Sequence, residues 1–397
     1  MHKIERLLHT LAPKGVEFRK LGEVCDFQKG KSITKKAVTF GKVPVISGGR
    51  QPAYYHNEAN RSGETIAISS SGVYAGYVSY WDIPVFLADS FSVSPKQKTL
   101  MPKYLFHYLT TQQDAIHATK STGGIPHVYG KDLQNFLIPI PPLEIQQEIV
   151  KILDAFTELN TELNTELKAR KKQYQYYQNM LLDFNDINLN HQDAKEKLAQ
   201  KTYPKNLKTL LQTLAPKGVE FRKLGEVCEI LDNRRIPIAK NKRNPGIYPY
   251  YGANGIQDYI DSYIFDGDFV LVGEDGSVIN KDNTPVVNWA SGKIWVNNHA
   301  HVLQTKNELK LKFLYFYLQT IDVSYCVVGT PPKINQENLK KITIPIPPLE
   351  IQQEIVKILD QFLALTTDLQ TGIPAEIEAR KKQYEYYREK LLAFKPL

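Results

Sequence analysis

Cysteine is scarce in this chain, in which only three of the 397 residues are of this type. Two of the three, Cys25 and Cys228, stand at equivalent places in a repeated segment, so the set does not form the framework of a disulfide-rich secreted protein. The chain also lacks an apolar run of ~18 residues that could cross a membrane, and the residues after Met1 do not resemble a signal peptide. These absences predict a soluble, cytoplasmic protein.

Sequence motifs that would identify an enzyme are missing as well. The Gly-x-Gly-x-x-Gly turn of a nucleotide-cofactor site does not occur. A DNA methyltransferase would carry Asp or Asn before a Pro-Pro pair, whereas the pairs here follow Ile140, Thr330 and Ile346. Glu308 and Lys310 could belong to a metal-dependent nuclease, but the chain contains no Pro-Asp dipeptide to accompany them. A single-chain methyltransferase or nuclease is therefore a rival hypothesis that the sequence disfavours.

Acidic residues and histidines offer only weak candidates for chemistry. Glu274 and Asp275 could act as paired carboxylates, but they lie in a glycine-bounded turn, where acidic residues are common without catalysis. His299 and His301 alternate with Ala300 along a strand, and this pair alone does not make a metal site. Other histidines lack the spacing of metal ligands, namely His107, His117 and His127. We assign the chain no catalytic residue, no metal and no cofactor of its own.

The charge balance of the chain is basic. Lysine and arginine number 50 and aspartate and glutamate 42, which gives a formal net charge of +8 at pH 7. Such a surplus is compatible with a polyanionic partner, although many basic proteins bind no nucleic acid. Hydrophobic residues make up 42% of the chain, enough for a sizeable core, and the length allows two or more domains.

The most informative feature of the sequence is an internal repeat. Residues 138–154 return letter for letter at 344–360, and residues 11–25 return at 214–228. The segments bracketed by these repeats resemble each other only faintly. The chain is therefore one unit duplicated, in the order globule, helix, globule, helix.

Each globule is expected to combine strands, turns and one helix. In the first globule, β-rich runs lie at 64–69 and 76–81, and an apolar stripe predicts a helix over 103–118. In the second, the corresponding helix is expected over 312–319. The polar segment after residue 184 is interpreted as a linker with few residues to bury. The predicted boundaries are 1–140 and 205–346 for the globules, 141–184 and 347–397 for the helices, and 185–204 for the linker.

Each long helix is expected to begin just after a Pro-Pro pair, because proline cannot sit inside a helix. From Ile149 apolar residues recur every seven positions, which predicts a coiled-coil seam. Asn160 lies in this seam, either as a polar residue that fixes the register or as a surface residue of a curved helix. In the second helix, Gly372 and Pro374 predict a kink or break.

The first helix also contains a short tandem repeat. The units Thr-Glu-Leu-Asn at 157–160 and 161–164 are followed by Thr-Glu-Leu-Lys at 165–168. Each unit adds about 6 Å of helix, and ~40 helical residues span roughly 60 Å. The repeat is either a spacer that holds the globules a set distance apart or a stable helical segment whose length has no function.

Two helices with apolar seams in one chain pack most simply antiparallel against each other. The predicted fold class is therefore α+β, with two α/β globules separated by two long antiparallel coiled-coil helices and an internal pseudo-twofold repeat. That symmetry would present two similar helix surfaces to two copies of one partner.

This organisation resembles the specificity subunits of type I restriction-modification enzymes. The resemblance covers the whole chain and rests on coinciding features: the doubled Ile-Pro-Ile-Pro-Pro-Leu-Glu-Ile-Gln-Gln-Glu-Ile, the Gly-Thr-Pro-Pro-Lys-Ile-Asn stretch from 329, the Trp295–His301 stretch and the tandem repeat. It implies that each globule is a target recognition domain for one half of a bipartite sequence in double-stranded DNA. It also implies that the helices set the unread gap and bind two modification subunits, which use S-adenosylmethionine, with restriction subunits as possible further partners.

Cations, amides and hydroxyls in the globules are the candidates for DNA contacts, because phosphates attract cations and base edges accept or donate hydrogen bonds. Any one of these residues could equally be a solvated charge or a packed aromatic. The candidates of the first globule are Lys29, Lys31, Lys35, Lys36, Arg50, Ser70, Tyr74 and Tyr77. Those of the second are Arg234, Arg235, Lys240, Lys242, Arg243, Tyr251 and Asn254.

Polar residues that follow each Pro-Pro pair fall off the apolar seam and are the candidates for partner binding. They are Gln146, Gln147, Glu148, Gln352, Gln353 and Glu354. A coiled-coil interaction protein without a DNA role is the remaining alternative.

Overall fold

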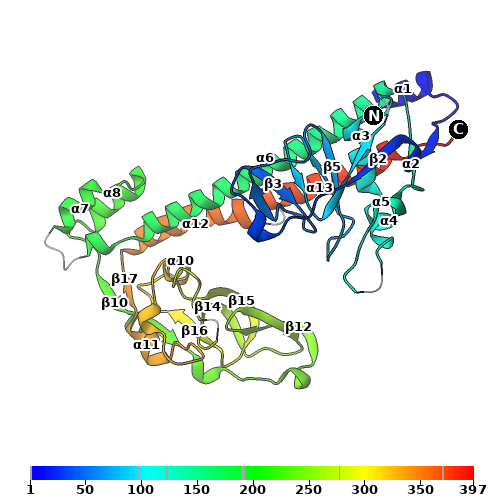
Figure 1. The fold of residues 1–397 in the computed structure, drawn as a ribbon. Coiled ribbons are helices and arrows are strands. Elements are labelled where there is room, and N and C mark those ends of the chain that lie inside the picture. Colours follow the sequence, from blue (N-terminus) through cyan, green and yellow to red (C-terminus); the bar gives the residue numbers. More distant parts are fainter. Residues whose placement is uncertain (1, 97, 122–123, 189–192, 277, 369–370) are drawn as a thin grey trace. The chain divides into compact units, whose positions relative to one another are not determined.

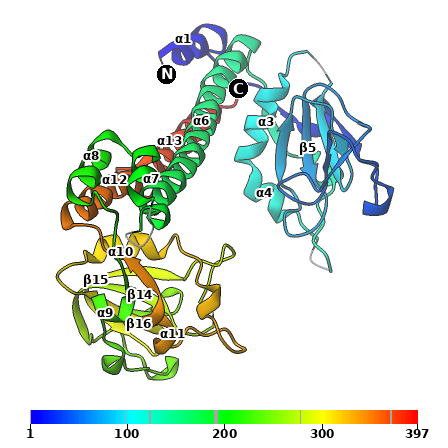
Figure 2. The ribbon, with the colours of Figure 1, turned by 90° about the vertical axis from the view of Figure 1, so that its left-hand side faces the viewer.

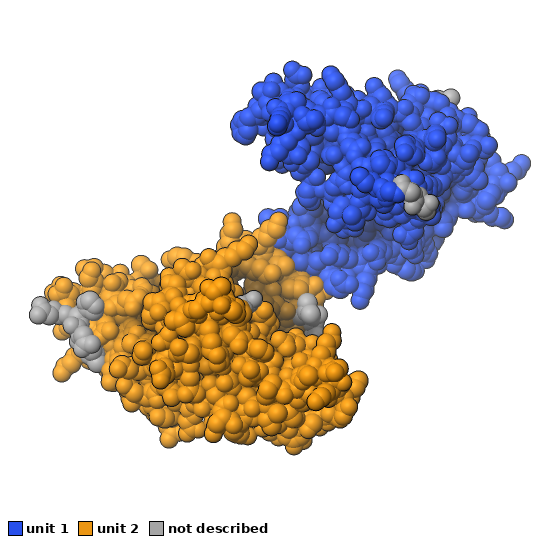
Figure 3. Space-filling view, turned by 60° about the horizontal axis from the view of Figure 1, so that its bottom comes forward, with its two compact units in different colours: residues 1–165, 376–397 blue, residues 166–375 orange. Residues whose placement is uncertain are grey.

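The computed structural model describes residues 2–96, 98–121, 124–188, 193–276, 278–368 and 371–397. The chain divides into two compact units, residues 1–165 with 376–397 and residues 166–375 (Figure 3). Each unit therefore holds one globule, the beginning of the long helix that follows this globule, and the end of the other long helix.

The globule of unit 1 is built on two sheets, with strand orders β2-β8-β5-β6 and β4-β3-β7. The strands are β2 (Cys25–Lys29), β3 (Val43–Ile46), β4 (Tyr54–His56), β5 (Thr65–Ser69), β6 (Val78–Trp81), β7 (Phe86–Leu87) and β8 (Ser90–Pro95). Figure 2 shows α3 (Pro102–Thr111) and α4 (Gln113–Ala118) beside the larger sheet. The helix expected over 103–118 is thus two helices, because Gln112 leaves helical geometry with ψ near 11°.

The globule of unit 2 has the same plan in a single sheet of order β11-β16-β14-β15-β12-β13. The strands are β11 (Cys228–Ile230), β12 (Pro245–Gly252), β13 (Gly255–Ile260), β14 (Phe265–Gly273), β15 (Val287–Val296) and β16 (Ala300–Thr305), and α10 (Leu311–Leu318) packs on β14, β15 and β16. The parallel pair β12–β15 corresponds to β3–β7 in unit 1. In unit 1 an exposed turn that contains Pro84 separates β6 from β7, because proline has no N–H to donate to a neighbouring strand. In unit 2 the strand β15 continues through the equivalent position.

The repeated segments close each globule by pairing with each other. In unit 1, β1 (Phe18–Lys20) pairs antiparallel with β9 (Leu137–Pro139), and in unit 2, β10 (Phe221–Lys223) pairs in the same register with β17 (Thr343–Pro345). The two variable globules therefore stand on nearly identical bases.

A buried glutamine joins the first globule to the beginning of α6 (Leu143–Leu182). The Gln146 side chain, 0% exposed, accepts a hydrogen bond from the Met101 N–H at 2.9 Å. It donates to the carbonyl oxygens of Thr99 at 2.8 Å and Pro141 at 2.7 Å. One amide thus satisfies backbone groups of the globule and of the proline corner, which would otherwise be buried without partners. We call this connection between a globule and its long helix the joint.

Gln352 forms the same joint at the beginning of α12 (Leu349–Thr367) in unit 2. It accepts from the Lys310 N–H at 2.7 Å and donates to the carbonyl oxygens of Glu308 at 2.9 Å and Pro347 at 2.7 Å. The assignment of Gln146 and Gln352 to a partner-binding surface is therefore corrected. Both side chains are fully buried and hold the fold together.

An ion pair between the globule and the long helix adds to each joint. Lys103 on α3 lies 2.6 Å from Asp154 on α6, and Lys312 on α10 lies 3.4 Å from Asp360 on α12. The two pairs connect equivalent elements in the two units.

The long helices pack through the predicted seam. In unit 1, the first part of α6 lies alongside α13 (Ile373–Leu392), and the Phe156 ring stacks on Tyr387 at 5.5 Å (Figure 1). In unit 2, the last part of α6 packs on α12, where Tyr177 stacks on Phe362 at 5.1 Å. This order of contacts is that of antiparallel helices. The expected break is confirmed between α12 and α13, where a Cβ on Gly372 would lie 2.7 Å from the Ala364 carbonyl oxygen.

The segment interpreted as a polar linker is more ordered than expected. It contains η2 (Asn185–Ile187) and α7 (Ala194–Gln200), and the core of unit 2 buries Ile187, Leu198 and Tyr203. The expectation of a segment with little to bury is therefore wrong for these residues. Asn188 forms a bridge with Val219, as Pro396 does with Val16 in unit 1, so each unit is closed by an equivalent segment.

The remaining described elements are short or lead into the globules. The helices α1 (His2–Leu11) and α8 (Lys205–Leu214) are amphipathic and precede the two globules. The others are α2 (Leu21–Val24), α5 (Gly130–Leu133), α9 (Leu224–Val227), α11 (Gln336–Lys341), η1 (Lys35–Ala37), η3 (Asp232–Arg234), η4 (Lys240–Lys242) and η5 (Ser324–Cys326). Among the described residues, no helix has the length and apolar character needed to span a membrane.

Because Gln146 is buried in the joint and Gln147 is not, we expect substitutions of these two residues to change the unfolding free energy by very different amounts. Gln146→Leu keeps the side-chain volume but leaves a buried N–H and two carbonyls unpaired, so we expect a loss of about 2–4 kcal/mol in the unfolding free energy. Gln147→Leu alters an exposed side chain and should change it by less than about 0.5 kcal/mol. Urea unfolding of the full chain measures both. Equal effects of the two variants would contradict a structural role for Gln146.

Candidate nucleic-acid interface

Five predicted cations of the first globule are exposed on its loops. Lys29 ends β2, Lys31 follows it, Lys35 and Lys36 lie in η1, and Arg50 lies between β3 and β4. No acidic residue occurs between positions 30 and 42. This loop therefore presents an unneutralised positive surface of the kind that attracts phosphates.

Three of the predicted residues come together around a guanidinium group. The Arg50 Cζ atom lies 4.9 Å from the centre of the Tyr74 ring and 5.6 Å from that of Tyr77. Tyr74 comes from the loop that follows β5, which the sequence placed near the DNA because of its hydroxyls and glycine. The cluster joins segments more than 20 residues apart in the chain.

A cleft of about 510 Å³ contains two further predicted residues, Lys29 and Ser70, and three that sequence reasoning missed. The missed residues are His127, Tyr129 and Lys131. The His127 and Tyr129 rings stack at 5.9 Å, and the Lys131 Nζ atom lies 5.5 Å from the Tyr129 ring centre. Aromatic faces beside ammonium groups can bind both bases and phosphates.

The cleft forms because the loop before α5 is bonded to the end of β5. The Val128 N–H donates to the Ser70 carbonyl oxygen at 2.9 Å, and residue 127 forms a bridge with residue 71. The signal in the sequence was the run Gly-Ile-Pro-His-Val-Tyr-Gly-Lys from Gly124, in which turn residues alternate with aromatic and basic ones.

Four predicted residues of the second globule are exposed. The Arg234 guanidinium lies 4.8 Å from the Phe265 ring centre and donates one hydrogen bond to the Ile264 carbonyl oxygen. Lys240 and Lys242 lie in η4, and Asn254 lies in the turn between β12 and β13.

The other three predicted residues of this globule serve its structure, and their assignment to a DNA surface is corrected. Arg243 donates to the Ile238 carbonyl oxygen, pairs with Asp258 at 3.3 Å and lies 4.0 Å from the Tyr250 ring centre. Tyr251 is buried in the apolar core of the sheet. These side chains are engaged within the globule rather than free on its surface.

Arg235 is likewise committed to a buried ion-pair network. Its side chain is 11% exposed, pairs with Asp232 at 3.4 Å and Glu274 at 2.5 Å, and donates to the Ala300 carbonyl oxygen at 2.8 Å. A buried guanidinium with two carboxylates is stable only with such complete pairing. The adjacent residues Arg234 and Arg235 therefore have different roles.

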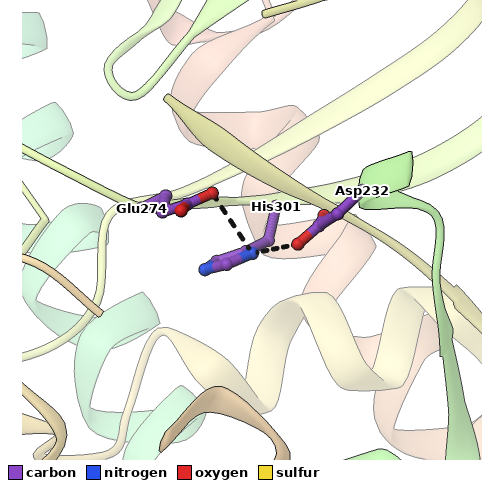
Figure 4. A group of neighbouring side chains, drawn as sticks. All are labelled: Asp232, Glu274 and His301. Carbon is purple, nitrogen blue, oxygen red and sulfur yellow. Dashed lines mark hydrogen bonds and ion pairs between the residues drawn. The ribbon is translucent and has the colours of Figure 1, made fainter. Parts of the chain in front are cut away.

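The same network contains a group of three side chains that could hold a metal ion by distance. Ligand atoms of Asp232, Glu274 and His301 all lie within 4.8 Å of one another. Figure 4 shows the two carboxylates on either side of the His301 ring, whose Nδ1 atom is 2.6 Å from Asp232 and 3.7 Å from Glu274. The His301 Nε2 atom bonds to the Ile334 carbonyl oxygen at 2.8 Å. Cations of the chain already pair with these carboxylates, because Arg235 lies 3.4 Å from Asp232 and 2.5 Å from Glu274, and Lys333 lies 3.0 Å from Glu274.

Titration of the buried groups follows from their surroundings. Burial by itself would raise the pKa of Asp232, but the hydrogen bond from His301, the charge of Arg235 and the Val302 N–H together hold this pKa below its ordinary value. Burial raises the pKa of the Cys25 and Cys228 thiols to about 12, so neither is a thiolate nucleophile at neutral pH.

The other four partner-binding candidates divide into two kinds. Glu148 pairs with Lys3 on α1, and Glu354 accepts a hydrogen bond from Asn206 on α8 at 2.8 Å. These two glutamates therefore attach the short helices α1 and α8 to the long helices. Gln147 and Gln353 are exposed. Beside Gln147, α6 has an apolar hollow of about 350 Å³ lined by Ile152, Ala155, Phe156 and Leu159 together with charged neighbours.

Comparison with known proteins places both halves of the chain in one family. The family model described as the type I restriction modification DNA specificity domain matches residues 13–172 and again residues 216–379. A type I restriction enzyme specificity subunit of Haemophilus influenzae is 45% identical over 194 residues, which is 47% of this chain and 50% of that protein. The specificity subunit of a type I restriction enzyme of Escherichia coli is 26% identical over 99% of this chain and 97% of its own length.

A solved structure has the same fold. The crystal structure of the S subunit of a type I restriction-modification system from M. genitalium aligns over 95% of this chain and 96% of that chain, with a TM-score of 0.62 and 19% identity.

The contrast between the two adjacent arginines is testable. Arg235→Ala leaves Asp232 and Glu274 buried without their cation, so we expect a loss of about 3 kcal/mol in unfolding free energy at pH 7, against less than about 1 kcal/mol for Arg234→Ala. Urea unfolding of each full-length variant provides the values. Because the folded pKa of Asp232 lies below 3.8, the contribution of the pair is present above that pH and is lost as the pH falls through the folded pKa. Equal stability of the two variants at pH 7 would show that Arg235 is not structural.

Proposed function

The chain belongs to the type I restriction modification DNA specificity family, and we propose that it selects the DNA target of such a system, each globule reading one half of a bipartite sequence. The observation that carries this proposal is a contrast between the paired strands that close each globule and the exposed surface of each globule. Two globules of one plan stand on nearly identical paired bases, yet their exposed cations and aromatics differ. A common scaffold with different surfaces is what two readings of different sequences require.

The chain itself performs no reaction in this proposal. Two modification subunits bind S-adenosylmethionine and methylate adenine in the target, and restriction subunits join the same assembly. The modification subunits dock on the two beginnings of the long helices, where the exposed Gln147 and Gln353 and the apolar hollow on α6 lie. The duplicated sequence favours two copies of one subunit, because two similar surfaces bind the same partner.

The long helices set the unread gap between the two half-sites. The repeat units at 157–168 lie within α6, where the Thr157, Thr161 and Thr165 hydroxyls each donate to a carbonyl oxygen one turn earlier. Removal of one unit keeps this pattern of hydroxyl hydrogen bonds, takes out about 6 Å of helix and shifts the heptad seam by four residues.

The experiment that tests the proposal maps methylated adenines in DNA from cells that express this chain with a modification subunit of the same system. We expect one bipartite target with a fixed gap. Deletion of Thr161–Asn164 should keep both half-sites and shorten the gap by about one to two base pairs, since duplex DNA rises ~3.4 Å per base pair.

A control variant keeps the helix length and changes only its side chains. Replacing Thr161 and Asn164 by Ala should leave the gap unchanged, because alanine preserves the helix. Methylation without sequence preference would reject the proposed function and favour an interaction protein. S-adenosylmethionine binding by the isolated chain would instead favour an enzyme.

A further inference from the structure

The turn that carries Arg50 is fixed against the strand beside it. A Cβ atom on Gly48 would lie 2.5 Å from the Ser71 carbonyl oxygen, so only glycine lets the turn approach so closely. The Ser69 hydroxyl donates to the Ser47 carbonyl oxygen at 3.1 Å. The backbone at Arg50 is therefore held by β5 and the residues that follow it.

The loop that carries the two tyrosines is held just as closely. The Tyr77 N–H donates to the Tyr74 carbonyl oxygen at 2.9 Å, and the Gly76 N–H donates to the Ser69 carbonyl oxygen at 2.7 Å. Gly76 has a φ of +86°, which favours glycine at this position. Arg50 thus rests on rings whose own backbone is bonded into the sheet.

Stacking on the rings leaves the edge of the guanidinium available. Ring contact covers the plane of the group, whereas its five N–H donors lie in that plane. The Arg50 side chain is exposed and makes no hydrogen bond or ion pair with the part of the chain that the structure describes. A fork that is already oriented loses little side-chain entropy on binding.

Two other arginines of this globule, Arg61 and Arg19, are used within the protein. Arg61 donates to the Ser92 hydroxyl at 2.9 Å and to the Asn60 carbonyl oxygen at 2.7 Å. Arg19 lies 3.8 Å from each of two glutamates in the base of the globule. Arg50, by contrast, is an exposed arginine of this globule whose donors are available for a two-pronged contact outside it.

We infer that Arg50 is a base-reading residue that donates two hydrogen bonds to one guanine in the half-site of the first globule, with Tyr74 and Tyr77 as its positioning residues. This inference rests on the proposed function. Guanine presents two acceptors, N7 and O6, on its major-groove edge, and arginine matches them with two parallel donors. A lysine offers a point charge instead and suits phosphates, as the loop of Lys31, Lys35 and Lys36 does.

The test measures binding of the full chain, with its modification subunit, to duplexes in which each base pair of the mapped target is changed in turn. Arg50→Ala should abolish the preference at a single G·C pair, a loss of about ten- to a hundredfold in discrimination, while all other preferences remain. Arg50→Lys should lose the same preference but keep the salt dependence of binding, because the charge is retained.

Two further variants separate positioning from general loss of charge. Tyr74→Phe keeps the ring and should keep the preference, whereas Tyr74→Ala should weaken it with Arg50 intact. Lys20→Ala removes an exposed charge from β1, at the base of the same globule, and should leave every preference unchanged. Urea unfolding of each variant verifies that it is folded.

The results that would overturn the inference are distinct from those that would reject the proposed function. If Arg50→Ala and Arg50→Lys both keep the preference at every G·C pair, Arg50 does not read guanine. If Arg50→Ala weakens binding equally on all sequences and lowers the salt slope by about one, the residue contacts a phosphate. Absence of any sequence preference in the unaltered chain would reject the proposed function itself.

Discussion

The hydrogen bonds of one buried glutamine at the beginning of each long helix are the constraint on which the rest of the structure depends. Gln146 and Gln352 each connect a globule, a proline corner and a helix through three backbone groups. A proline pair cannot continue a helix, so the chain turns there, and the amide satisfies the groups that this turn exposes. Each globule is thereby joined to its helix through the loop that precedes α3 in unit 1 and the loop that precedes α10 in unit 2.

The paired strands that close each globule and the loops on its surface have separate roles, which explains why some segments are repeated and others differ. The segments that must pair, β1 with β9 and β10 with β17, are repeated almost unchanged, whereas the loops above them are free to differ. In the second globule this freedom includes a buried network around Arg235. Surface chemistry can vary in this way without loss of the fold, because loop residues contribute little to the common base.

The sequence predicted the architecture well because repeats, proline pairs and heptads are local signals. The helix entry, the break near Gly372 and the pairing of the long helices all follow from such signals. The roles of single polar residues could not be predicted in this way. Gln146 lies seven residues before Leu153, on the heptad seam rather than off it, and its side chain bonds to Thr99 and Met101, which lie over 40 residues away.

The same limit applies to the candidate interface. Arg234 and Arg235 are indistinguishable in sequence, and partners distant along the chain, Glu274 and the Ala300 carbonyl oxygen, identify Arg235 as structural. The residues of the cleft around Tyr129 were missed because two separate loops create it. By contrast, Arg50, Tyr74 and Tyr77 were each chosen for their chemistry, and the structure brings them together.

The proposed function requires that a globule alone determines its half-site and that the joints and the long helices alone determine the gap. The most direct test maps methylated adenines for a chain in which residues 26–136 are replaced by residues 229–342. Such a chain carries two copies of the second globule. The account predicts a target in which the second half-site replaces the first and the gap is unchanged. Persistence of the original first half-site, or a half-site that neither globule read before, would contradict it.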